Sequence, residues 1–89
     1  MLFVALLKVR AGTIQERTAR RLEWKVPEGS KILAEYWLQT PDPNAIVVSE
    51  ADHISQIWAM TMGWDDVFDI SVYPAVDAQE GIELLKQML

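Results

Sequence analysis

The stretch from Lys31 to Glu50 constrains the fold most, because it predicts a β-hairpin near the middle of the chain. Its first part, KILAEYWLQ, alternates in the manner of a strand, and its last part, AIVVSE, is apolar and β-branched. Between them TPDPN carries two prolines and an asparagine, which disfavour a helix and a continuous strand alike. Two antiparallel strands are therefore predicted over residues 31–39 and 45–50.

A strand and a helix are predicted before this hairpin. Leu2 to Val9 is a short apolar run typical of a buried strand. Thr13 followed by Glu16 matches a capping box, in which side chains satisfy the free backbone donors of a helix start. The helix is expected to run to about Lys25.

After the hairpin the same two kinds of element return in the order helix, strand. Asp52 is expected to cap a helix through about Met62, and VFDISVYP, residues 67–74, is the fourth strand. Asp77 and Glu80 then predict a last helix, with an apolar stripe formed by Ala78, Ile82, Leu85 and Leu89.

This order predicts one α+β domain over residues 1–89 with a ferredoxin-like βαββαβ topology. Two right-handed crossovers would place both helices on one face of a four-stranded antiparallel sheet, with the C-terminal helix in addition. A chain of 89 residues buries a limited fraction of its surface, so self-association would help to stabilise it.

Composition argues against several classes of partner. Thirteen acidic against eight basic side chains give a net charge of −5, which disfavours nucleic acid. The chain has no cysteine and no apolar run long enough to span a membrane, and its first residues resemble a strand more than a signal peptide. We expect a cytoplasmic protein without a cofactor.

Strand alternation predicts an unusual sheet face opposite the helices. The side chains expected under the helices are Ile32, Ala34, Tyr36, Leu38, Ile46, Val48, Phe68, Ile70 and Val72. The opposite face would receive Gln39 and Val47 together with six candidate cavity-lining residues, Glu35, Trp37, Ser49, Asp69, Ser71 and Tyr73. Aromatic rings among carboxylates and hydroxyls suit a wet cavity or an interface between two sheets.

Several stretches resemble a known family: GSKILAEYW, AIVVSEAD running into ISQIWAMTMGWDD, and DISVYPAVD. They are similar to uncharacterised prokaryotic proteins of about this length, a domain of unknown function within the dimeric α/β-barrel superfamily of ferredoxin-like folds. The resemblance implies a homodimer in which two sheets face each other across a cavity. It supplies no catalytic residues.

Two helical segments carry further candidates. In WAMTMGW, helical spacing assigns Trp58 and Met62 to the core and turns Met60 outward as an interface candidate, while Trp64 plugs the end of the helix. His53, the only histidine, is expected to be solvated. Arg17, Arg20 and Arg21 share a face of the first helix as an anion-binding candidate, and the alternative is a solvated face with a Glu16 to Arg20 pair.

Two functional hypotheses follow. The first is a non-catalytic homodimer, joined through the open sheet face, that binds a small organic molecule or a partner. The alternative is a cofactor-independent isomerase or monooxygenase in which Glu35 or Asp69 acts as general acid or base in the cavity. Fold alone does not choose between them.

Overall fold

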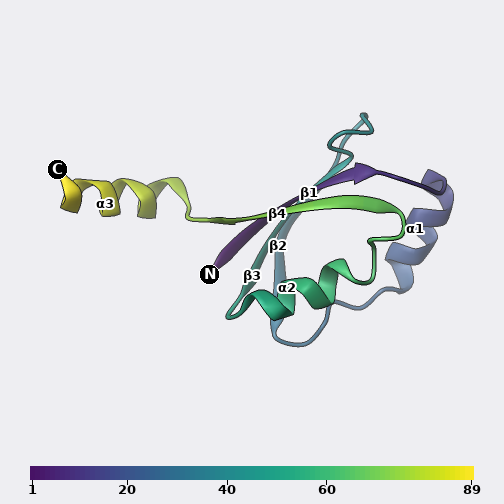
Figure 1. Ribbon diagram of the computed structural model, residues 1–89, viewed down its shortest axis with the longest axis horizontal. Helices are drawn as coiled ribbons and strands as arrows, with labels where there is room; N and C mark the ends of the chain where they lie inside the picture. The colour runs from purple at the N-terminus through teal and green to yellow at the C-terminus, as the bar shows by residue number, and fades with distance from the viewer.

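The computed structural model describes residues 1–89 and contains the predicted elements in the predicted order (Figure 1). Four strands and three helices alternate along the chain. They are β1 (Leu2–Val9), α1 (Ile14–Glu23), β2 (Ser30–Trp37), β3 (Ala45–Ala51), α2 (Ile54–Thr61), β4 (Phe68–Ala75) and α3 (Ala78–Met88).

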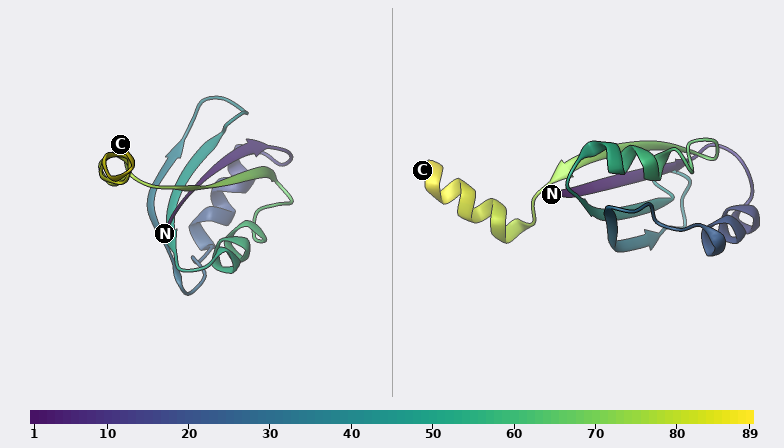
Figure 2. Two further views of the ribbon diagram at one scale, coloured as in Figure 1. Left: turned by 60° about the vertical axis from the view of Figure 1, so that its left-hand side comes forward. Right: turned by 90° about the horizontal axis from the view of Figure 1, so that it is seen from below.

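The strands form one antiparallel sheet in the order β2-β3-β1-β4. Helices α1 and α2 lie on the same face of this sheet (Figure 2). The predicted α+β, ferredoxin-like architecture is confirmed in this respect. The chain contains no helix long and apolar enough to cross a membrane.

Each helix starts at a side chain that accepts a hydrogen bond from a backbone N–H group. The Thr13 hydroxyl accepts from the N–H of Glu16, and the Asp77 carboxylate accepts from the N–H of Glu80, as the capping patterns predict. Helix α2 differs from the prediction because His53, one residue beyond Asp52, is its N-cap. The imidazole accepts from the N–H of Ser55, so His53 has a local structural role.

A β-bulge in β2 changes which side chains face the helices. Ile32 pairs with Ser49 and Ala34 pairs with Val48, so Leu33 is an extra residue in the β2 strand. Beyond Leu33 the two faces of β2 exchange relative to uninterrupted alternation.

The faces predicted for β2 are therefore wrong from Ala34 to Trp37, and the two faces predicted for β3, which has no bulge, are exchanged along the strand. The helix side receives Glu35 and Trp37 from β2 together with Val47 and Ser49 from β3. Of the six candidate cavity-lining residues predicted for the open face, only Asp69, Ser71 and Tyr73 of β4 lie there. The open face also receives side chains that were expected under the helices, namely Ala34, Tyr36, Ile46 and Val48. On β4 the prediction agrees with the structure, since Phe68, Ile70 and Val72 face the helices.

Two small hydrophobic clusters lie between the sheet and the helices. One contains Phe3, Ala51, Ile57 and Met60, and the other contains Trp64, Val67 and Phe68. The sequence-based orientation of α2 was wrong, because Met60 is buried whereas the side chains of Trp58 and Met62 are 59% and 73% exposed. Trp64 packs against Phe68 and Trp24, and Trp24 also packs against the cluster that contains Met60. The predicted burial of Trp64 is confirmed.

Helix α3 projects away from the sheet. It continues beyond the end of β4 and contacts neither α1 nor α2 (Figures 1 and 2). No residue of α3 is buried.

Candidate functional site

A pocket of about 130 Å³ lies between the helix-side face of the sheet and helices α1 and α2. Its lining comes from all four strands and both helices, and 16 of its 23 residues are hydrophobic. A concave, mostly apolar site with a few convergent polar groups is the usual form of a small-molecule pocket. The pocket is therefore the strongest candidate site in this chain.

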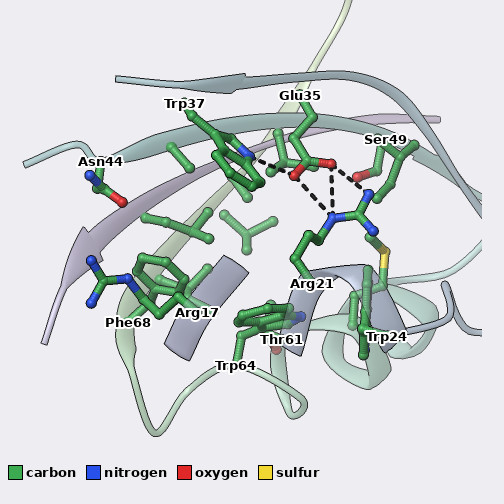
Figure 3. A pocket seen from close by; sticks show the side chains of 18 of the residues that line it. Arg17, Arg21, Trp24, Glu35, Trp37, Asn44, Ser49, Thr61, Trp64 and Phe68 are labelled. Atoms are coloured by element: carbon green, nitrogen blue, oxygen red, sulfur yellow. Dashed lines mark hydrogen bonds and ion pairs between the residues drawn. The ribbon is translucent and has the colours of Figure 1, made fainter. Parts of the chain in front are cut away.

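The principal polar group of the pocket is the carboxylate of Glu35 (Figure 3). Arg21 on α1 donates to it from Nη2 to Oε1 at 2.8 Å and from Nε to Oε2 at 3.1 Å. The indole Nε1 of Trp37 donates to Oε2 at 2.8 Å. The side chains of Arg21 and Glu35 are 32% and 20% exposed, so this ion pair is half-buried at the edge of the pocket.

These contacts keep Glu35 ionised. The hydrogen bonds from Arg21 are the main cause that lowers the pKa of Glu35; partial burial opposes them, and the Trp37 hydrogen bond adds to the lowering. The same bonds raise the pKa of Arg21. The pair presents a fixed carboxylate and a fixed guanidinium whose charges cancel.

Ser49 supplies a second polar group. Its residue is only 3% exposed, and it lies on β3 one helix-side position from Val47, the partner of Glu35 (Figure 3). The Ser49 hydroxyl takes part in no side-chain hydrogen bond. Every fully buried side-chain oxygen or nitrogen of the protein has a hydrogen-bond partner. The Ser49 oxygen has none, so it is not fully buried and is open to the pocket that Ser49 lines. It is free to bond a ligand.

An aromatic cluster of Trp24, Trp64 and Phe68 forms one wall of the pocket. The rings of Trp24 and Trp64 meet edge to face with centroids 5.8 Å apart, and Phe68 lies 6.0 Å from Trp64. Both tryptophans and Phe68 line the pocket. Gly63 permits this packing, because a Cβ atom there would lie 3.0 Å from the Trp24 indole nitrogen.

The three arginines that were candidates for anion binding, Arg17, Arg20 and Arg21, all have partners within the chain. Arg17 donates to the backbone carbonyls of Ala11 and Gly12, and Arg20 makes a two-point ion pair with Asp66. Each guanidinium also lies over an aromatic ring, at 5.7 Å from Phe68 for Arg17, 5.4 Å from Trp64 for Arg20 and 5.5 Å from Trp24 for Arg21. The guanidinium groups therefore hold α1 onto the aromatic cluster, and the alternative Glu16 to Arg20 pair is replaced by the contact with Asp66.

The structure separates the six candidate cavity residues into two groups. Glu35, Trp37 and Ser49 line the pocket. Asp69, Ser71 and Tyr73 lie on the open face, where Asp69 approaches Arg10 at 3.6 Å. Glu35 and Asp69 lie on opposite faces of the sheet and do not share a cavity.

Sequence reasoning missed the residues that close the pocket from the helix side and from the β2–β3 turn. These are Met60, Thr61, Asn44 and Trp24, all of which line the pocket. The spacing of Ile57, Met60 and Trp64 along one helical stripe is the signal that would have found Met60. No group of three or more His, Cys, Asp or Glu side chains is arranged to hold a metal ion.

Comparison with known families gives one result. The family described as "Domain of unknown function (DUF3303)" matches residues 1–89. Neither the curated proteins nor the solved structures include a match to this chain.

Proposed function

The chain belongs to the DUF3303 family, a domain of unknown function, and from the geometry we propose that it binds a small, uncharged, mainly apolar organic molecule between its sheet and helices. The observation that carries this proposal is the pocket itself, with its apolar lining, its neutralised Glu35–Arg21 pair and the free hydroxyl of Ser49.

The size of the pocket indicates a ligand with a single ring. An apolar cavity of about 150 Å³ in another protein holds benzene, and the pocket here measures about 130 Å³. The aromatic side chains Trp24, Trp64 and Phe68 favour contact with a flat ring.

The polar groups favour an uncharged ligand with one hydroxyl or carbonyl oxygen. At this ion pair a ligand carboxylate would compete with Glu35 for Arg21, and a ligand ammonium group would compete with Arg21 for Glu35. The two residues already make hydrogen bonds to each other at 2.8 to 3.3 Å. The Ser49 hydroxyl makes no such bond and can donate to or accept from a ligand oxygen. A phenol is the simplest molecule with these properties.

The alternative of an enzyme with a carboxylate acid or base has less support. A general base near neutral pH needs a raised carboxyl pKa, whereas hydrogen bonds from Arg21 lower that of Glu35. Asp69 is outside the pocket, with a side chain that is 59% exposed. A binding role without chemistry therefore fits these residues better.

We also propose that the protein is a homodimer joined through the open sheet face. Val4, Leu6, Ile46 and Val48 form an apolar centre on this face, and no element of the same chain covers them. Uncovered apolar surface of this kind is typical of interaction sites. Association would bury it and add stability to a short chain.

Ligand binding can be tested by titrating the protein with p-cresol and with toluene while recording tryptophan fluorescence. Trp24, Trp37 and Trp64 line the pocket, so a bound ring changes their emission. We expect p-cresol to bind more tightly than toluene. The Ser49→Ala variant should weaken p-cresol binding about threefold to tenfold, the value of one neutral hydrogen bond, and leave toluene binding nearly unchanged.

Ser71→Ala is the matched control, because it removes the same hydroxyl from the opposite face of the sheet. It should leave both affinities unchanged. Absence of any fluorescence response to either compound, or equal effects of the two serine variants, would contradict the proposed site.

A further inference from the structure

Helix α3 is an amphipathic helix without a partner in its own chain. Its apolar side chains Ile82, Leu84, Leu85 and Met88 are between 46% and 79% exposed. Successive positions along the helix place them in one continuous arc with Leu89, opposite the polar residues Gln79, Glu80, Glu83, Lys86 and Gln87.

A helix of this length needs a packing surface. An isolated helix shorter than about 12 to 15 residues is marginal in water, and α3 has 11. Lys86 and Glu83 form its only side-chain ion pair, at 3.3 Å with both groups more than 60% exposed, and such a pair contributes little. The apolar arc is therefore the part of α3 that must be covered.

The connection to β4 directs α3 away from its own sheet. Only Val76 and Asp77 separate the two elements, and Asp77 is the N-cap with extended backbone angles of φ −68° and ψ 161°. The helix thus continues outward from the strand (Figure 1), and the molecule measures 49 Å along its longest axis against 29 and 17 Å.

A second apolar surface that no element of the chain covers is the centre of the open sheet face, where Val4, Leu6, Ile46 and Val48 are half-buried. Charged pairs border it at both ends: Lys8 opposite Asp69 and Lys31 opposite Glu50. The apolar centre between them covers the adjacent strands β1 and β3, about 5 Å apart. Two neighbouring strands, each about 5 Å wide, form a strip about 10 Å across. This width matches one helix, which is about 10 Å in diameter with its side chains.

We propose that α3 is an exchanged arm, whose apolar arc packs on the open sheet face of a second copy of this chain. A two-fold arrangement would then cover both arms and both sheets with a single kind of contact. This inference rests on the dimer proposed above and names the element that covers the sheet. It is independent of the proposed ligand.

The contact can be observed by nuclear magnetic resonance in a mixed dimer of isotope-labelled and unlabelled chains. Isotope-filtered spectra then contain only magnetisation transfer between different chains. We expect transfer from the methyl groups of Ile82 and Leu85 to those of Val4 and Val48.

Every other pattern overturns the arm. Transfer only between the two sheets means direct stacking of the open faces, and transfer only between the two α3 helices means a helix pair. Transfer between α3 and Val4 that appears in the unfiltered spectrum and is missing from the filtered one means that the helix folds back on its own chain. The first two outcomes contradict the arm and leave a dimer, whereas a monomer at high micromolar concentration contradicts the dimer too.

A pair of variants gives a second readout by light scattering. Leu85→Glu places a charge in the apolar arc and should weaken the dimer about a hundredfold or more, since each dimer buries two copies of this side chain. Gln87→Glu adds the same charge on the polar side of α3 and should leave the dimer intact. Circular dichroism confirms that both variants fold, and equal association of the two would refute the proposal.

Discussion

The ion pair between Arg21 and Glu35 should stabilise the fold, and a double-mutant cycle can measure its contribution. Two N–H groups of Arg21 bond both carboxylate oxygens at 2.8 and 3.1 Å, a geometry that favours a strong pair. The variants are Arg21→Ala, Glu35→Ala and the double replacement. The cycle cancels the separate contact of Arg21 with the Trp24 ring.

The expected coupling follows from the exposure of the pair. A hydrogen bond to a charged group contributes about 1.5 to 3 kcal/mol when buried, and an exposed ion pair about 0.2 to 1 kcal/mol. The Arg21 and Glu35 side chains are 32% and 20% exposed, so solvent screens them in part. We therefore expect a coupling of about 1 to 2 kcal/mol in the free energy of unfolding.

The assay is urea unfolding followed by fluorescence, at one protein concentration because association would shift the midpoint. Arg20 and Asp66 give a matched control cycle, since this pair has the same two-point geometry but side chains that are 40% and 61% exposed. Its coupling should be the smaller of the two and should fall more steeply with added salt. Equal couplings, or none between Arg21 and Glu35, would refute the assignment of the pair as a half-buried support of the pocket.

Two further results are expected from the same unfolding assay. The pKa of Glu35 is lowered in the fold, so its contribution to the free energy of unfolding is complete above the ordinary value of 4.5 and is lost as the pH falls through the folded pKa. Glu35→Gln should reduce this loss of stability at acid pH, and an unchanged pH profile of stability would contradict the expectation. Met60→Ala should lower the free energy of unfolding by about 2 to 5 kcal/mol because the side chain is buried, whereas Met62→Ala should change it by less than about 0.5 kcal/mol. A larger loss of stability for Met62→Ala than for Met60→Ala would support the orientation of α2 predicted from the sequence.

The elements of the fold could be predicted from the sequence because their signals are local. Thr13 and Asp77 start helices through their own side chains, and the prolines of TPDPN separate the hairpin strands whatever the rest of the chain does. Such signals depend on neighbours a few residues away. They fix the order of elements and hence the topology.

The orientation of α2 depends on a contact that is not local. Ile54 and Ile57 belong both to the stripe that continues through Trp58 and to the stripe that continues through Met60. Trp64 decides between them, because its ring packs against Trp24 of the chain segment after α1. A helix of 8 residues with apolar side chains on most of its surface cannot specify its own rotation.

The composition of the pocket depends on the single extra residue in β2. Side chains alternate with a period of two, so one inserted residue exchanges the faces of everything that follows it. Leu33 has this effect on Glu35 and Trp37: an uninterrupted strand with Ile32 toward the helices would have turned both to the open face. The bulge instead places the carboxylate within reach of Arg21 on α1. The same shift leaves Ala34 and Tyr36 on the open face, so one irregularity assigns β2 side chains both to the proposed ligand site and to the proposed dimer surface.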